Sequence, residues 1–158
     1  MRIQTIVPVS LLLMVLMVMS AGCSTTNSEK QPIVTPTPGT TAVQLFNKGF
    51  DSYIDGDYPT ALNFYNESIA SDPTFTLVWI EKGKVLVRLN RSAEAISAYD
   101  SALALDNNIS EIWNNRGEAL MNLGRYTEAL DSFEKALQIA PDYTTAKENK
   151  DLALAKLK

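Results

Sequence analysis

The sequence predicts an all-α fold made of repeated helix pairs, and three observations support this prediction. Glycines recur at one fixed interval, as Gly49, Gly83 and Gly117, with no insertion between them. Alanine and aromatic residues follow these glycines at fixed distances, as Ala61 and Tyr65, Ala95 and Tyr99, and Ala129 and Phe133. Residues 76–109 and 110–143 also share identical Trp, Gly, Leu, Arg, Glu and Ala positions. A fixed period of 34 residues is the sequence signature of a helical repeat array.

Residues 1–22 have the composition of an export signal. Arg2 precedes the almost wholly apolar residues 6–19, a run that is short for a membrane-spanning helix, which needs about 20 apolar residues. The sequence then becomes small and polar. We therefore expect residues 1–22 to be a signal peptide and the protein to be exported.

Cys23, the single cysteine, follows this apolar run. One cysteine allows no intramolecular disulfide and no thiolate metal cluster. The stretch from Ser20 to Cys23 resembles the lipobox of prokaryotic lipoproteins, in which the peptide is cut before a cysteine that carries a diacylglyceryl group, although the family usually has leucine at the place of Ser20. The resemblance implies a lipid anchor at Cys23, and two acyl chains hold a protein stably on a membrane. A signal that is uncleaved or cleaved elsewhere, and an incidental thiol, are the alternatives.

Residues 23–41 are predicted to link this anchor to the folded part. They are rich in Thr, Ser and Pro and nearly free of large apolar residues, so they cannot pack a core. Such a composition is typical of a semi-extended tether. A low-complexity interaction tail is the alternative.

Residues 42–75, 76–109 and 110–143 are predicted to be three units of two antiparallel helices each. A glycine inside the first helix of a unit costs about 1 kcal/mol relative to alanine. We therefore expect the second helix to approach the backbone too closely for a Cβ there. The expected contact is the alanine of the second helix, so that Gly117 meets Ala129.

These units resemble the tetratricopeptide repeat, whose pattern W-x2-L-G-x2-Y, A-x3-F and P is matched by Trp113, Gly117, Ala129, Phe133 and Pro141. The resemblance covers residues 42–143 and implies a right-handed superhelical solenoid. Trp79 and Pro73 also fit the pattern, whereas Asn90 and Asn107 replace a turn glycine and the closing proline, and asparagine tolerates such turn conformations. The family's leucine is replaced by Lys48, Lys82 and Arg116, whose methylenes are expected to cover the core while their charges stay in water.

Residues 144–158 begin a fourth unit but provide only one helix, which we predict to cap the solenoid with a polar outer face. Asp151 stands at the glycine position, as expected where no second helix packs. The residues expected to face solvent are Lys147, Glu148, Lys150, Asp151, Lys156 and Lys158, and those expected to pack inward are Ala153, Leu154 and Leu157.

The composition argues against catalysis. The chain has no histidine and one cysteine, which removes Ser-His and Cys-His nucleophiles and the usual zinc sites. Acidic residues such as Glu94 and Glu128 recur at equivalent positions expected to be exposed, and no glycine-rich phosphate loop is visible. The net charge of -4 argues against nucleic acid as a partner. We therefore expect no enzyme activity, no cofactor and no metal.

Three Asn-x-Ser/Thr sequons are present, at Asn66, Asn90 and Asn108. In an exported protein they are candidate glycosylation sites, and Asn90 and Asn108 fall in predicted turns, where access is easiest. Chance occurrence is the alternative.

The family resemblance implies that the first helices line a concave groove that binds a protein or peptide. The family's contact positions fall here at Phe46, Asn47, Phe50, Tyr53 and Ile54 in the first unit, Ile80, Glu81, Lys84, Val87 and Arg88 in the second, and Asn114, Asn115, Glu118, Met121 and Asn122 in the third. Chaperone-tail binders of the family use a carboxylate clamp of Lys, Asn and Arg. Because Phe46 and Phe50 stand where this clamp begins, we do not expect that ligand class.

The groove is predicted to bind a segment with apolar side chains and an acidic group. Phe46 and Phe50 would bury the apolar part, and Lys84 and Arg88, one helical turn apart, would receive the carboxylate. In the alternative, the aromatic side chains belong to the core and Glu81 and other acids neutralise the bases.

Two functions follow from these observations. The first is a membrane-anchored adaptor or scaffold that holds a partner at the outer face of the cytoplasmic membrane or at the outer membrane. The second is a structural lipoprotein that self-associates or helps to assemble an envelope complex such as a pilus or secretion machine.

We predict that Cys23→Ser moves the protein from the membrane fraction to a soluble or medium fraction, because the anchoring sulfur is lost. Fractionation and labelled fatty-acid uptake measure this, with Ser28→Ala as a control that keeps the cysteine. Continued sedimentation of the Cys23→Ser protein with membranes, together with no label on the wild type, would contradict the lipid anchor.

Overall fold

The computed structural model describes residues 41–158, which form seven α-helices and no β-strand. The predicted signal peptide, Cys23 and nearly all of the linker lie outside these residues. None of the described helices has the length and hydropathy that a membrane span requires. The helices are α1 (Ala42–Ile54), α2 (Tyr58–Ser71), α3 (Thr76–Arg88), α4 (Ser92–Leu105), α5 (Ser110–Asn122), α6 (Tyr126–Ile139) and α7 (Thr144–Lys156).

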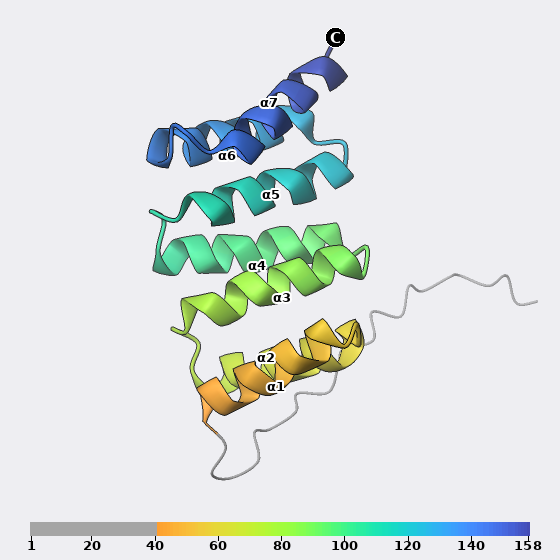
Figure 1. The fold of residues 1–158 in the computed structure, drawn as a ribbon, viewed down its shortest axis with the longest axis vertical. Coiled ribbons are helices and arrows are strands. Elements are labelled where there is room, and N and C mark those ends of the chain that lie inside the picture. The colour runs from red at the N-terminus through yellow and green to blue at the C-terminus, as the bar shows by residue number, and fades with distance from the viewer. Residues whose placement is uncertain (1–40) are drawn as a thin grey trace, which may run out of the picture. The chain divides into compact units, whose positions relative to one another are not determined.

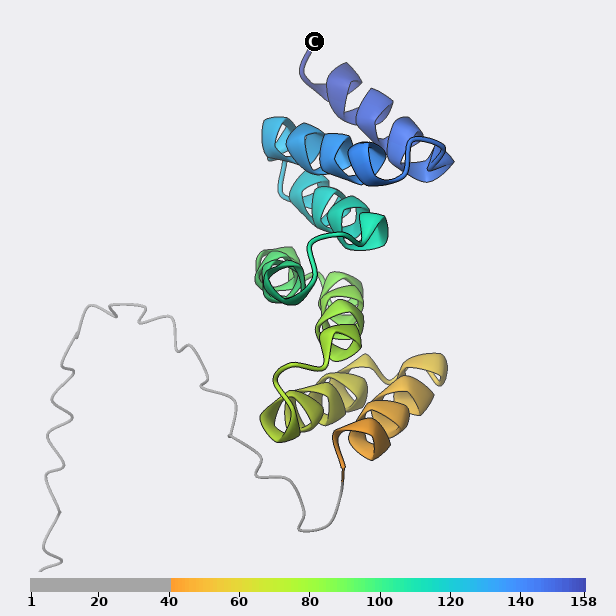
Figure 2. The same ribbon diagram turned by 90° about the vertical axis from the view of Figure 1, so that its left-hand side faces the viewer.

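Consecutive helices form stacked pairs, α1 with α2, α3 with α4 and α5 with α6, and α7 packs on α6 (Figure 1). The first helices of successive units also contact one another, α1 with α3, α3 with α5 and α5 with α7, whereas α2, α4 and α6 do not. The first helices therefore lie on the inner side of the stack and the second helices on the outer side (Figure 2). The predicted all-α repeat solenoid is confirmed.

The turn inside each unit uses a left-handed residue at one repeat position. Gly56 and Gly124 have φ of 80° and 72°, and Asn90, between them in the repeat, has φ of 58°. Asparagine is among the few residues that tolerate this conformation, because its short polar side chain can form hydrogen bonds with nearby groups of the chain. The replacement of glycine by Asn90 therefore leaves the turn unchanged.

The fixed spacing of tryptophan and the closing residue has a hydrogen-bonding reason. The indole nitrogen of Trp79 donates to the backbone carbonyl of Pro73 at 2.9 Å, and that of Trp113 donates to the carbonyl of Asn107 at 3.0 Å. Each tryptophan thus fixes the start of its helix to the end of the preceding unit. Because only a backbone carbonyl is used, Asn107 can replace proline.

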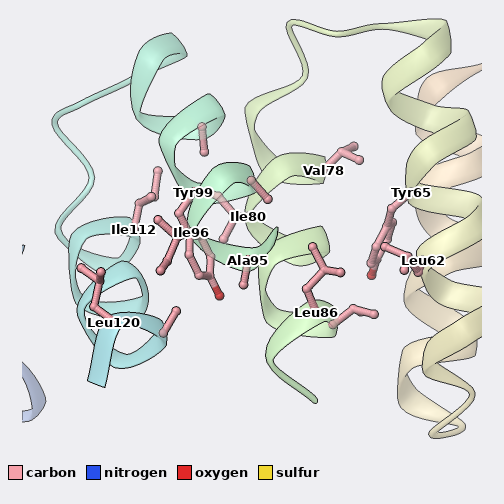
Figure 3. Packing of buried hydrophobic residues seen from close by; sticks show 14 of the residues in the cluster. Leu62, Tyr65, Val78, Ile80, Leu86, Ala95, Ile96, Tyr99, Ile112 and Leu120 are labelled. Atoms are coloured by element: carbon pink, nitrogen blue, oxygen red, sulfur yellow. The ribbon is translucent and has the colours of Figure 1, made fainter. Parts of the chain in front are cut away.

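The core lies between the two layers of helices and is continuous along the stack (Figure 3). One aromatic side chain from each second helix is fully enclosed, and aliphatic side chains of the first helices fill the space between successive aromatics. The largest such residues are Tyr65, Tyr99, Phe133, Val78, Leu86, Ile112 and Leu120.

The glycines are required by these aromatic rings and not by the alanines, which corrects the expected contact. A Cβ on Gly117 would lie 2.4 Å from Cε1 of Phe133, and one on Gly83 would lie 2.4 Å from Cε1 of Tyr99. The same atom on Gly49 would lie 2.6 Å from Cε1 of Tyr65. These separations are far below van der Waals contact, since carbon atoms attract best at about 3.5–4.0 Å. The alanines Ala61, Ala95 and Ala129 are fully buried, but among the three atoms nearest to each added Cβ only Ala61 contributes one, its carbonyl oxygen at 3.3 Å from a Cβ on Gly49.

The basic side chains that replace the family's leucine do not simply extend into water. Each covers an aromatic ring or joins a polar side chain of another helix. The contacts are Lys48 Nζ over the Phe64 ring at 5.8 Å, Lys82 Nζ over the Trp79 ring at 5.2 Å, and Arg116 with the carboxylate of Asp100 at 2.7 Å and the hydroxyl of Ser132 at 2.8 Å.

The cap helix α7 differs from the prediction at two positions. Ala153 is buried as expected, but Leu154 and Leu157 are exposed. Leu154 occupies the repeat position of Leu86 and Leu120, which are both fully buried in units that have a second helix. No second helix follows α7 within the described residues, so the side chain stays open. Ala146 and an ion pair between Lys150 and Glu134 (2.9 Å) hold α7 in place instead.

We predict that Gly117→Ala lowers the free energy of unfolding by about 1–3 kcal/mol through overpacking against Phe133. The sign of the change in the free energy of unfolding is diagnostic, because alanine in a helix interior should otherwise be about 1 kcal/mol more favourable than glycine. Urea unfolding measures the change. Asp151→Ala, at the same repeat position of α7, is the control and should be neutral or slightly stabilising.

A double variant identifies the clashing partner. Gly117→Ala combined with Phe133→Leu should cost less than the sum of the two single changes, because the smaller side chain makes room for the new methyl group. Additive costs, or a Gly117→Ala protein as stable as the wild type, would show that the ring does not require the glycine.

Candidate binding groove

The inner face of the stack contains a hollow that collects residues from three first helices. Tyr53 of α1, Lys84 and Arg88 of α3, and Asn115 and Glu118 of α5 line a depression of about 510 Å³. With Val87, which also lines it, six residues at the predicted contact positions are brought together. Asn90 and Tyr99 complete this central hollow.

A second hollow, of about 740 Å³, lies beside it between α5 and the segment that leads into α7. Asn115 and Glu118 line both hollows, so the two are adjacent along the inner face. We call the two hollows, together with the adjoining face of α1 that carries Phe50 and Tyr53, the groove. The second hollow is lined by Ser110, Glu111, Asn114, Asn115, Glu118, Ala140, Asp142, Tyr143, Thr144 and Thr145.

Most of this second hollow was not predicted from the sequence. The predicted positions begin after the first turn of each first helix, whereas Glu111 lies in the first turn of α5 and Asp142 and Tyr143 lie in the loop before α7. The one available signal was the acidic residue near the start of α5. Nothing in the repeat pattern marks the loop residues as part of the inner face.

The aromatic residues of α1 divide between core and surface. Phe46 is half-buried and lies 5.4 Å from Phe75 and 5.8 Å from Tyr65 between ring centroids, so it belongs largely to the core. Phe50 stacks on Phe46 at 6.3 Å but remains 41% exposed. Tyr53 is half-buried against Tyr58 and lines the central hollow. Asn47 and Ile54 are exposed on the same helix.

Three positions carried over from the family do not offer a free side chain. Ile80 packs in the hydrophobic core and Glu81 is buried, so neither is open to a partner. Asn114 is also buried, at the floor of the second hollow, and it donates to Glu118 Oε1 at 2.7 Å. Each lies where α3 or α5 meets a neighbouring helix, and its side chain is already in contact with other residues of the protein.

Lys84 is neutralised within the protein, which corrects the expectation that it receives a ligand carboxylate. Its Nζ lies 2.9 Å from Glu81 Oε1 and 2.8 Å from Glu111 Oε1. Burial by itself would lower the pKa of Lys84, but the hydrogen bonds and charges of Glu111 and Glu81 outweigh burial and raise that pKa. Lys84 therefore stays charged and serves to bridge two carboxylates on different helices.

Arg88 has a different environment. Its side chain is exposed in the central hollow, and no acidic partner within residues 41–158 forms an ion pair with it. Interaction with the Tyr53 side chain raises the pKa of Arg88 further above its usual value. Of the two bases predicted to meet a carboxylate, only Arg88 is open to a ligand.

Glu118 is held by amide groups. Its Oε1 accepts from Asn114 Nδ2 at 2.7 Å and from Asn149 Nδ2 at 2.9 Å, and Asn149 also donates to Asn114 Oδ1 at 3.0 Å. This network joins α5 to α7 across the floor of the second hollow. In the part of the chain that the structure describes, no His, Cys, Asp or Glu cluster could hold a metal ion.

The sequons occupy two kinds of site. Asn90 and Asn108 lie exposed in connections between helices, as predicted. Asn66 instead lies within α2, and the serine of its sequon, Ser68, is buried and donates to the Ala42 carbonyl at 2.7 Å. Access to Asn66 in the folded protein is correspondingly restricted.

Comparison with known proteins agrees with this geometry. Residues 80–144 match the family model of the tetratricopeptide repeat. The fold is a tetratricopeptide-type solenoid. No curated protein matches the chain significantly in sequence.

Solved structures extend the likeness over the described helices. The first tetratricopeptide domain of Spaghetti (RPAP3), bound to the HSP90 peptide SRMEEVD, is 25% identical with a TM-score of 0.72, over 74% of this chain and 93% of that one. The second such domain of human RPAP3, in complex with the HSP70 peptide SGPTIEEVD, is 25% identical with a TM-score of 0.70, over 72% of this chain and 94% of that one. The tetratricopeptide domain of Arabidopsis OM64 is 24% identical with a TM-score of 0.71, over 73% of this chain and 95% of that one.

We predict that Lys84→Met lowers the free energy of unfolding by about 1–3 kcal/mol, because it leaves the buried Glu81 carboxylate without a partner. Arg88→Met should change it by about 0.5 kcal/mol or less, as is usual for an exposed side chain. Urea midpoints of the two variants measure the contrast. Adding Glu81→Gln to Lys84→Met should restore part of the lost stability. Equal effects of Lys84→Met and Arg88→Met would contradict the assigned role of Lys84.

Proposed function

We propose that this protein is a membrane-anchored binding module that holds a segment of a partner protein in the groove formed by α1, α3 and α5. The observation that carries the proposal is the convergence of Tyr53, Lys84, Arg88, Asn115 and Glu118 on one open hollow. Helical solenoids use their inner surfaces to bind other proteins.

The aromatic end of the groove supplies the apolar contact that such binding needs. Phe50 is a large exposed side chain beside the partly buried ring of Phe46. Aromatic residues next to polar groups are typical anchors of protein interfaces, because they bury a large area with little loss of side-chain freedom. Tyr53 and Arg88 extend this end toward the central hollow.

Two related domains of RPAP3 were solved with peptides bound, which supports a protein or peptide ligand for this chain. Their peptides, SRMEEVD and SGPTIEEVD, are acidic at the carboxyl end. In this chain Phe46 and Phe50 stand where the family's carboxylate clamp begins, and Lys84 is already paired with Glu81 and Glu111. A chaperone tail is therefore not the ligand that we propose.

The anchor completes the proposal. With residues 1–22 as a signal peptide, a diacylated Cys23 and the Thr/Pro-rich residues 23–41 as a tether, the module would stand off the outer face of the cytoplasmic membrane or the outer membrane. Its role would be that of an adaptor that keeps a partner at that surface.

Self-association is the second candidate function, and the cap helix favours it. Leu154 is exposed at a position that is buried in the second and third units, and Leu152 and Leu157 are exposed at the same end of the chain. A structural lipoprotein that assembles through α7 would form stable oligomers, whereas an adaptor of the proposed kind would be a monomer. Size-exclusion chromatography of the wild type and a Leu154→Ser variant separates the two.

We predict that Phe50→Ala reduces recovery of the protein's partners from envelope extracts, because the main apolar anchor of the groove is lost. Leu105→Ala is the matched control, since Leu105 is 42% exposed on an outer helix, close to the 41% of Phe50. Mass spectrometry of proteins cross-linked in intact cells gives the readout. Recovery of the same proteins in the same amounts with Phe50→Ala would rule out the groove as the binding surface.

A further inference from the structure

Carboxylates of two first helices gather at the part of the groove between α3 and α5. Lys84, which lines the central hollow, lies 2.9 Å from Glu81 of α3 and 2.8 Å from Glu111 of α5, and Glu118 of α5 lines the same hollow. Carboxylates from two first helices, α3 and α5, therefore surround the same part of the inner face.

The bases that line the two hollows are Lys84 and Arg88, and both lie in the central one. Lys84 is one cation shared by two carboxylates, Glu81 and Glu111. In the second hollow the lining includes Glu111, Glu118 and Asp142 and contains neither lysine nor arginine. The end of the groove nearest α7 therefore favours a positively charged group.

Glu118 is the carboxylate best placed to receive that group. It is exposed and lines both hollows, and no lysine or arginine within residues 41–158 forms an ion pair with it. The amides of Asn114 and Asn149 both donate to Oε1, which fixes the carboxylate and leaves Oε2 to accept from a ligand. A pre-oriented anion binds a cation without losing further side-chain freedom.

A neighbouring amide adds a second, independent feature. Asn115 Nδ2 is buried and has no hydrogen-bond partner, and Asn115 lines both hollows beside Glu118. Buried amide groups in folded proteins are nearly always paired. Rotation of the partly exposed Asn115 side chain would bring this donor to the backbone carbonyl of an extended segment that crosses from one hollow to the other.

We propose that the groove selects an extended protein segment in which a lysine or arginine side chain binds Glu118 while an apolar side chain packs on Phe50. This inference rests on the proposed function and reverses the charge that the sequence pattern suggested for the ligand. Arg88, at the other side of the central hollow, would repel a second basic residue near the apolar one. The selected segment is thus basic at its α7 end only.

The test uses the full-length protein in detergent micelles and three pools of synthetic peptides of about twelve residues, which reach roughly 40 Å when extended. Each peptide has one fixed phenylalanine among random Ala, Ser, Thr and Gly residues. The pools differ only in one further position, which carries Lys, Gln or Glu. Retained peptides are counted by mass spectrometry at low and high salt.

The wild type should retain the Lys pool about three- to fivefold better than the Gln pool, in the range of an exposed ion pair, and the Glu pool least. High salt should reduce this preference. Glu118→Gln keeps an oxygen for the two asparagine amides and should abolish the preference for Lys while retaining the Gln pool. Asp131→Asn, which removes one exposed charge from α6, should leave the preference unchanged.

The outcomes separate this inference from the proposed function. Retention of all pools without a Lys preference, or a preference that survives in Glu118→Gln, overturns the inference and leaves the groove as a binding site. Absence of retention of any pool by the wild type overturns both. If Asp131→Asn lowers the preference for Lys as much as Glu118→Gln does, the preference comes from the overall charge of the protein, and this result would also overturn the inference.

Discussion

The structure depends on one close contact, repeated in each of the three units, between a glycine of the first helix and an aromatic ring of the second. At Gly83 and Gly117 the ring approaches to a distance that leaves no room for a Cβ. The helices of a pair can therefore pack around a large, fully buried side chain and still remain close. Because the contact recurs at the repeat period, each unit has the same internal geometry and the units stack in a regular way.

Regular stacking determines where a ligand surface can form. Contacts between successive first helices, without equivalent contacts between second helices, place α1, α3 and α5 on the inner side. The tryptophan bonds to Pro73 and Asn107 fix the junctions between units. Side chains from three different repeats, such as Tyr53, Lys84 and Asn115, thereby reach one hollow although no local interaction connects them.

Electrostatic interactions inside the groove then decide which of these residues a ligand can meet. Lys84 has acidic neighbours on its own helix and on α5, so its charge holds the two helices together. Glu118 is held by neutral amides and keeps its charge available. The same repeat position, occupied by Phe50 in the first unit, Lys84 in the second and Glu118 in the third, thus has an apolar, a structural and an anionic role in turn.

The sequence by itself determined the repeat, its helix pairs and the left-handed turn at Asn90. These features follow from interactions within a unit or between adjacent units, and the repeat period records them directly. Tertiary structure alone decided that rings and not alanines require the glycines, that Ile80 and Asn114 are buried, and that Leu154 is exposed. It also paired Lys84 with Glu111 and Glu118 with Asn149. Burial and pairing depend on which side chains of other helices are within reach, and the spacing of residues along one chain does not contain that information.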